Sequence, residues 1–299
     1  MQEAPVLRPL SVGDIIDRTL RLLRANPVLF LGITVLPNLI TDVLERAVGL
    51  SQTFDLNDLN AVLSRPGATP VLPSQLHPVD PVAGSVVGIV AFALSLAQAA
   101  AITIAIGQRY LNRPETVPDA YRRGVRSLPR LLLSVLAIGV LFVVAVVVVA
   151  IALTILASLG LAAVAVIIGL VGFFFLLPWA FLSVTLVVPA IVIDGLGPIA
   201  AIRRSFQLMD KARLRTLGLE VLTVIIIIIL SLVFSVIFLA AFVAEPTLRA
   251  VLQTIADVAS ASIGAALLYG VTVILYYDLR VRKEAFDLQL AAEALPREG

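Results

Sequence analysis

The chain has 299 residues, of which 60% are hydrophobic and only 14% are charged, and this composition excludes an ordinary soluble globular protein. The formal net charge is only +2, and cysteine is absent, which excludes disulfides, thiolate metal sites and a cysteine nucleophile. With His77 as the single histidine, a histidine–carboxylate metal site is not expected either. The sequence predicts an all-α integral membrane protein with one domain over residues 1–299.

Six apolar stretches are long enough to cross the hydrocarbon core, which needs about 20 helical residues. The fourth contains Pro178 and Pro189, and we interpret it as one kinked, tilted helix, with two short passes as the alternative. Stripes of small residues in the second and sixth stretches predict interior helices, whereas the Val/Ile/Leu-rich third and fifth are expected to face lipid. The predicted fold is a polytopic bundle of six transmembrane helices. Their approximate ranges are 28–48, 84–107, 131–157, 161–193, 216–243 and 254–277.

Three amphipathic stretches, here called the elbow helices, precede the outgoing spans and begin near Ser11, Val117 and Gly197. In "SVGDIIDRTLRLLRANP", Ser11 and the Asp14 that follows three residues later form a helix-start pattern. "VPDAYRRGVRSLPRLL" is the shortest of the three. In "GPIAAIRRSFQL", Pro198 suits a first helical turn. Its predicted apolar stripe is Ile199, Ile202, Phe206 and Met209.

Each elbow helix and the hairpin after it form one unit, and the chain is predicted to contain three such units followed by a tail. The units lie near 11–107, 117–193 and 197–277, and the short cytoplasmic tail covers 278–299. We expect the elbow helices to lie in the membrane interface, with their apolar faces in the acyl boundary and their arginines among lipid phosphates.

The basic residues fall on one side of the predicted spans. Of the 22 lysines and arginines, all but Arg46, Arg65 and Arg249 lie in the segments at that side. Because basic residues are retained in the cytoplasm, both termini are predicted to be cytoplasmic. The preference for arginine over lysine, with the richness in alanine and valine, indicates a bacterial protein. The predicted location is therefore the bacterial cytoplasmic (plasma) membrane.

Arginines on the elbow helices are the predicted contacts to anionic lipid headgroups. For Arg203 or Arg204 the alternative is a fixed bidentate contact with a phosphate or with a carboxylate such as Asp194. The residues expected at headgroups are Arg18, Arg21, Arg122, Arg123, Arg203 and Arg204.

Polar residues inside the spans are few, and one group of them is a candidate site. Asn38, Asp42 and Arg46 are spaced four residues apart in the outer half of the first span, and Asp257 lies at a similar depth in the sixth. An outward-facing polar vestibule is the functional interpretation. An ion pair at a helix end, without a ligand, is the alternative.

Three stretches, "LRPLSVGDIIDRTLRLLRANP", "VPAIVIDGLGPIAAIRRSFQL" and "YYDLRVRKEAFDL", together resemble the glycerophosphoryl diester phosphodiesterase membrane-domain family. The resemblance covers essentially the whole chain and implies a stand-alone bacterial integral membrane protein. In that family the membrane region sometimes precedes a phosphodiesterase barrel with a metal site of histidines and carboxylates. Only residues 278–299 follow the last span, so the barrel is not expected and no catalytic residue is carried over.

The sequence also lacks a phosphate-binding glycine loop and a Ser/His/Asp set, and the chain is therefore not expected to be an enzyme. The predicted function is a non-catalytic membrane protein that organises lipid or protein partners at the cytoplasmic face. The alternative is a small transporter or permease for an amphiphilic or lipid-related substrate, which would require connected polar residues through the bilayer. No cofactor, metal or nucleic-acid partner is expected, and protein partners and oligomeric state stay open.

Overall fold

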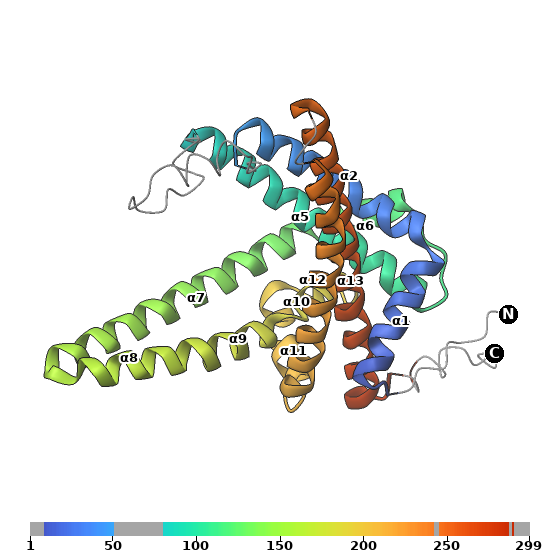
Figure 1. The fold of residues 1–299 in the computed structure, drawn as a ribbon. Helices are drawn as coiled ribbons and strands as arrows, with labels where there is room; N and C mark the ends of the chain where they lie inside the picture. Colours follow the sequence, from blue (N-terminus) through green and yellow to red (C-terminus); the bar gives the residue numbers. More distant parts are fainter. Residues whose placement is uncertain (1–8, 51–79, 242–244, 287–288, 290–299) are drawn as a thin grey trace, which may run out of the picture.

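The structure, a computed structural model, describes residues 9–50, 80–241, 245–286 and 289, and every regular element in these ranges is a helix (Figure 1). His77, Arg65 and most of the predicted external loop lie outside the described residues. Two π-helical segments, η1 (Ala157–Leu161) and η2 (Gly172–Leu176), flank α8. The α-helices are α1 (Val12–Ala25), α2 (Pro27–Ala47), α5 (Pro81–Tyr110), α6 (Val117–Val125), α7 (Leu128–Leu156), α8 (Ala162–Val171), α9 (Leu177–Val184), α10 (Val187–Val192), α11 (Pro198–Met209), α12 (Arg213–Ala241) and α13 (Pro246–Glu284).

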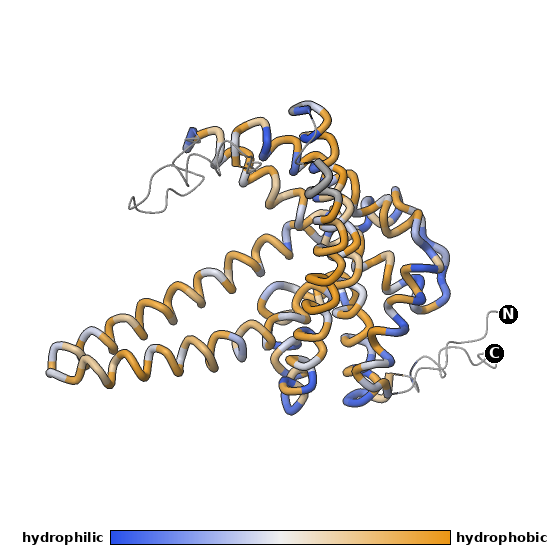
Figure 2. Tube along the Cα trace, viewed as in Figure 1, coloured by the Kyte–Doolittle hydropathy of each residue, from blue (hydrophilic) through white to orange (hydrophobic). Residues whose placement is uncertain are grey.

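Three helical hairpins diverge from a common base (Figure 1). They are formed by α2 with α5, by α7 with α8 and α9, and by α12 with α13. The shorter helices α1, α6, α10 and α11 gather at the base, where they pack against the ends of the long helices. The hydropathy colouring distinguishes one of these hairpins from the loops of the base. The hairpin of α7 with α8 and α9 is hydrophobic over nearly its whole length, whereas hydrophilic residues gather in the loops of the base (Figure 2).

Five helical segments are long and apolar enough to cross a membrane, and this indicates a membrane protein. The third of them, Leu128–Val192, has 65 residues, and within it the chain reverses direction between α7 and α8 (Figure 1), where η1 contains Gly160. Gly160 has a φ of 81°, a left-handed conformation that glycine adopts without the strain of a Cβ atom. The other four segments are Pro27–Ala47, Pro81–Tyr110, Arg213–Val236 and Thr247–Glu284.

The arm that returns from Gly160 departs from regular α-helix before each of its prolines. The π-helical segment η2 lies directly before Pro178, which cannot donate a backbone hydrogen bond and crowds the carbonyl four residues earlier. A second break at Leu186 precedes Pro189, and the chain continues as the separate helix α10. The stretch 161–193, predicted as one kinked helix, is thus divided into α8, η2, α9 and the separate six-residue α10.

The interior position of the second and sixth predicted spans is confirmed. In the most apolar 18-residue stretch of each segment, 61% of the residues are buried in α13 and 50% in α5. The corresponding share is 11% in α12 and zero in Leu128–Val192. The buried core lies toward the base, where Phe30, Ile102 and Tyr276 are fully enclosed. Helix α13 also continues to Glu284, so the predicted tail of 278–299 begins as ordered helix.

Helices α1, α6 and α11 occupy the three stretches predicted to be elbow helices, and the predicted start of α1 is confirmed in detail. The backbone N–H of Ser11 donates to Asp14 Oδ2 at 2.9 Å, and the Asp14 N–H donates to Ser11 Oγ at 3.1 Å. This reciprocal pair satisfies two backbone donors that a helix start would otherwise leave unpaired. The third elbow helix begins at Pro198, as predicted.

The expectation that the apolar faces of the elbow helices lie in the acyl boundary is wrong for their buried residues. Ile15 of α1, Ala120 of α6 and Ala201 of α11 are each fully enclosed by other helices. The predicted stripe of α11 is also displaced, because Ile199 is exposed. Small side chains let a helix approach its neighbours closely, which explains why the buried face is centred on alanine and serine. That face consists of Ala201, Ser205, Leu208 and Met209.

Candidate functional site

The four residues of the predicted intramembrane cluster meet between α2 and α13. Arg46 Nε donates to Asp42 Oδ2 at 2.8 Å, and Arg46 Nη2 donates to Asp257 Oδ2 at 2.5 Å. Asn38 Nδ2 donates to Ser262 Oγ at 3.1 Å on the facing helix. Residues 46 and 257 are 211 positions apart in the sequence, so only the packing of α2 on α13 unites them.

Three adjoining cavities of about 300, 370 and 420 Å³ surround this cluster, and we call them together the polar vestibule. The first two share Asn38 and Thr41, and the last two share Asp257 and Ala261. The vestibule therefore extends across α2, α5, α12 and α13. Its further lining residues are Pro37, Asp42, Glu45, Ala91, Phe92, Ser95, Gln98, Ser231, Phe234, Ser235, Ala256, Val258 and Ser260.

A packed apolar layer separates the vestibule from the base. Ile33 of α2, Ile102 of α5 and Ala266 of α13 belong to one core cluster, and all three are buried. Ile102 follows Gln98, a vestibule residue, by one helical turn. The polar surface thus ends near the level of Gln98 in this conformation.

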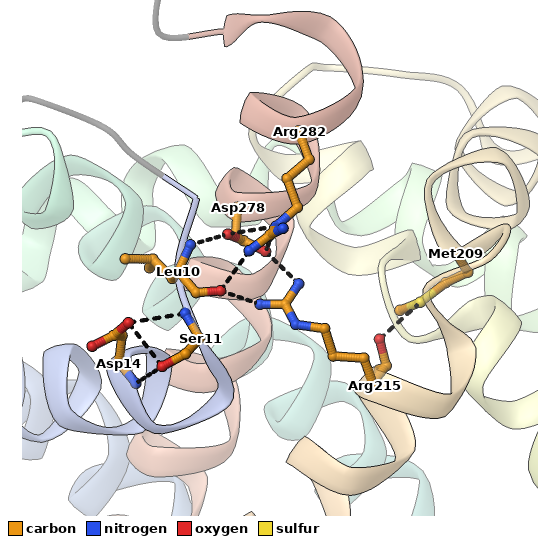
Figure 3. Close-up of polar contacts among 8 residues, drawn as sticks. Leu10, Ser11, Asp14, Met209, Arg215, Asp278 and Arg282 are labelled. Carbon is orange, nitrogen blue, oxygen red and sulfur yellow. Dashed lines mark hydrogen bonds and ion pairs between the residues drawn. The ribbon is translucent and has the colours of Figure 1, made fainter.

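At the base, the buried carboxylate of Asp278 joins three parts of the chain (Figure 3). It accepts hydrogen bonds from the Leu10 N–H at 2.6 Å, from Arg215 Nη1 at 2.7 Å and from Arg282 Nε at 3.0 Å. Both guanidinium groups also donate to the Leu10 carbonyl, at 2.5 Å from Arg215 and 2.7 Å from Arg282. The segment before α1, the start of α12 and the end of α13 are therefore fixed to one another.

A second basal network is built around Asp194, which follows α10. Its carboxylate accepts from Tyr276 Oη at 2.5 Å and from Arg280 Nη1 at 3.0 Å, and Arg204 Nη2 lies 3.5 Å away. Arg204 also makes a bidentate contact with Glu284. Burial lowers the pKa of Arg204, but the hydrogen bonds with Glu284 and Tyr276 outweigh this and raise the pKa above its ordinary value. Arg204 is thus a charged structural link at this site.

The other predicted headgroup arginines differ in their surroundings. Arg18 donates to Tyr110 Oη at 3.1 Å, Arg21 pairs with the exposed Asp17, and Arg123 pairs with the buried Glu115. Within the part of the chain that the structure describes, Arg122 and Arg203 are exposed and have no hydrogen-bonding or ionic partner. Contact with lipid headgroups stays a prediction for these side chains.

Sequence analysis did not single out Asp278, Glu284 or Glu115, although they anchor the basal ion pairs. One signal was available in "YYDLRVRKE", where Asp278 and Arg282, and likewise Arg280 and Glu284, are four residues apart. No comparable spacing in the sequence indicated the ion pairs that these residues form with more distant parts of the chain. Among the residues that the structure describes, no three His, Cys, Asp or Glu side chains are grouped so that they could hold a metal ion.

Tyr121 of α6 compensates for a proline in α2. Pro37 has no N–H to offer the Ile33 carbonyl one turn earlier, and Tyr121 Oη donates to that carbonyl at 2.6 Å. Burial raises the pKa of Tyr121 to about 12. The neutral phenol is therefore the form that the folded protein favours.

Replacing Tyr121 by Phe is expected to lower the free energy of unfolding by about 1–2 kcal/mol at neutral pH, because the Ile33 carbonyl loses its donor. Since the pKa is raised on folding, the advantage of the wild type is complete below pH 10. It should shrink as the pH rises from about 10 toward 12. Unfolding titrations of wild type and Tyr121→Phe across this range measure the difference. A difference that stays constant with pH would contradict the assignment.

A comparison with protein-family models gives one match, to the Domain of unknown function (DUF7847), over residues 10–279. The matched region includes α1 through most of α13, and it ends before Arg280, Arg282 and Glu284 of the basal networks. No curated protein and no solved structure matches the chain. The resemblance to the glycerophosphoryl diester phosphodiesterase membrane-domain family is not tested by these findings and stays a prediction. Because the family model matches most of its length, the chain belongs to the family of Domain of unknown function (DUF7847).

Proposed function

We propose that the chain is a non-catalytic integral membrane protein that organises anionic lipid at the cytoplasmic face of a bacterial plasma membrane. The proposal counts six spans, because α7 and the run of α8 and α9 would cross separately on either side of Gly160. It places the base in the cytoplasm, since the basic residues are concentrated there.

The observation that carries the proposal is the way the elbow helices present their arginines. Helices α6 and α11 are fixed by the buried Ala120 and Ala201, so their positions relative to the spans are set by packing. Arg122 and Arg203 on the same helices stay exposed. A fixed arginine near anionic headgroups contributes on the order of 1 kcal/mol of attraction. Several such groups on a rigid base would retain a shell of anionic lipid.

Changing both Arg122 and Arg203 to Glu is expected to reduce the retention of phosphatidylglycerol, whereas changing both to Lys should preserve it, because diffuse headgroup attraction needs only positive charge. Native mass spectrometry of protein released from mixed phosphatidylglycerol and phosphatidylcholine nanodiscs counts the retained lipids. Arg249→Glu, at the opposite end of the bundle, is the control and should retain lipid as the wild type does. Retention by the Glu pair as high as that of the wild type would refute the proposal. Loss of lipid from the Lys pair as large as that from the Glu pair would instead indicate a specific arginine site.

A permease for an amphiphile is the second candidate, and the polar vestibule is the observation that favours it. Passage would require the vestibule to connect to the base. The packed layer of Ile33, Ile102 and Ala266 stands between them, so transport would need this layer to open. This favours lipid organisation as the first proposal.

A further inference from the structure

We propose that the guanidinium of Arg213 is a fixed binding site for the phosphate of an anionic phospholipid. The site lies at the base, where α9, α11 and α12 meet. This inference deepens the function proposed above, because it adds one specific lipid site to a diffuse shell. It rests on that function for placing the base at the level of the headgroups.

Two contacts fix the plane of the Arg213 guanidinium. Its central carbon lies 4.3 Å from the centroid of the Trp179 ring, and its Nε donates to Ser183 Oγ at 3.2 Å. Trp179 in turn makes an edge contact with Phe206 of α11, with 6.4 Å between the ring centroids. A guanidinium that is already held in place loses little further conformational freedom when it binds a ligand. Arg213 is therefore preorganised for binding.

The Nη groups of this guanidinium are available to a ligand. Among the described residues, neither Nη atom of Arg213 donates a hydrogen bond, and Asp210 Oδ1 lies 3.9 Å from Nη1. That separation is too long for a hydrogen bond, and the Asp210 side chain is 61% exposed, so water weakens the ion pair. Arginine presents a planar set of donors that matches two oxygens of a phosphate. The free Nη groups can therefore hold a phosphate with two hydrogen bonds.

The charge around the site favours an anionic lipid. Lys211 is exposed in the loop before α12, and Lys283 Nζ donates to the Gln207 and Asp210 carbonyls at 2.9 and 2.7 Å. Arg213 and these two lysines carry three positive charges along the loop, whereas Asp210 carries one negative charge. This excess attracts a headgroup with a net negative charge.

Exposed apolar side chains beside Arg213 favour a lipid over free phosphate. Trp179 is 47% exposed, and Phe181 on the same helix and Leu214, the next residue after Arg213, are also exposed. Arg213 begins the apolar segment Arg213–Val236, so in the proposed topology it lies where the hydrocarbon core meets the headgroups. Tryptophan is enriched at this level of membrane proteins. A lipid whose phosphate binds Arg213 would therefore have its acyl chains beside apolar side chains.

Trp179 is the only tryptophan of the chain, and its fluorescence reports on the site directly. Bromine quenches indole fluorescence on contact, so phosphatidylglycerol with dibrominated acyl chains should quench Trp179 when it occupies the site. In phosphatidylcholine nanodiscs, this quenching should saturate at a low mole fraction of the brominated lipid. Brominated phosphatidylcholine should quench only in proportion to its mole fraction. Equal quenching by the two brominated lipids at every mole fraction would overturn the proposal.

Charge-conserving variants separate a fixed site from diffuse attraction. Arg213→Lys keeps the charge but loses the planar set of donors, and it should weaken the preference for phosphatidylglycerol about tenfold. Arg122→Lys together with Arg203→Lys is the matched control and should leave the quenching curve unchanged. If Arg213→Lys does not fold, Ser183→Ala removes the hydroxyl that accepts from Nε and should weaken the preference several-fold. A preference equal to that of the wild type in the variant measured would refute the fixed site.

Competition identifies the source of the phosphate. Unbrominated phosphatidylglycerol should relieve the quenching, and sodium phosphate should relieve it no more than sodium chloride of equal ionic strength. Greater relief by sodium phosphate would overturn the lipid assignment and indicate a site for free phosphate.

This experiment and the lipid-retention experiment can fail separately. Loss of the preference in Arg213→Lys would support the fixed site even if the variant with Glu at both Arg122 and Arg203 retains lipid as the wild type does. Equal quenching by both brominated lipids, with lipid lost from that Glu pair, would refute the fixed site alone.

Discussion

Replacing Asp278 by Ala is expected to lower the free energy of unfolding by about 3 kcal/mol, because it leaves Arg215 and Arg282 without their shared carboxylate. The Asp278 side chain is fully buried, and the same change also removes the acceptor of the Leu10 N–H. An unpaired donor and two uncompensated cations at the base would loosen the start of α1 from α12 and α13. Unfolding in mixed dodecyl maltoside and dodecyl sulfate micelles, followed by circular dichroism, measures the loss.

A matched variant separates this effect from the general cost of removing a charge. Asp17 pairs with Arg21 on the exposed face of α1, and Asp17→Ala should change stability by no more than about 0.5 kcal/mol. If Asp278→Ala and Asp17→Ala lose similar amounts, the basal network does not stabilise the fold.

The second large effect is expected from Gly270→Ala in α13. A Cβ atom at this position would lie 2.5 Å from Thr19 Cγ2, a distance that real Cβ contacts do not reach. Thr19 is buried on α1, and the two helices would have to separate. Overpacking of this kind costs about 1–3 kcal/mol. The variant should therefore unfold at a lower denaturant concentration than the wild type.

A second substitution, at Thr19, can relieve this close contact. Thr19→Ser removes the Cγ2 methyl group and keeps the hydroxyl that donates to the Ile15 carbonyl at 2.8 Å. The double variant Thr19→Ser with Gly270→Ala should recover most of the lost stability. Gly88→Ala is the control, because a Cβ there meets nothing within 4 Å. A Gly270→Ala protein as stable as the control would show that α1 does not pack on α13 at this point.

Local properties of the sequence determined the helices and which of them are interior. Hydropathy over about 20 residues identifies long apolar helices whatever their neighbours are. The capping pair of Ser11 and Asp14 spans three residues, so its geometry follows from the local pattern alone. Small residues predicted that α5 and α13 lie inside, because only small side chains allow helices to approach closely over their whole length.

In α11 the local hydropathy pattern does not predict which residues are buried. Periodicity selects the most apolar stripe, and Ile199 belongs to it, yet Ile199 is exposed and Ser205 is buried. Ser205 is enclosed because its hydroxyl donates to the Ser183 carbonyl at 2.6 Å and accepts from the Leu186 N–H at 3.2 Å. An apolar side chain gains as much from lipid as from protein, so hydropathy cannot choose between the two.

Only the tertiary structure decided which charges pair. Asp278 meets Leu10 across 268 residues, and Arg46 meets Asp257 across 211. Such pairs depend on hydrogen-bond distances of about 3 Å, which are fixed by how whole helices pack and not by any spacing in the sequence. The sequence by itself therefore determined that the chain is a set of apolar helices with polar residues at their ends. The packing of α1, α2, α5, α11 and α12 around α13 determined that those polar residues form two basal ion-pair networks and one vestibule, because each joins side chains from separate helices.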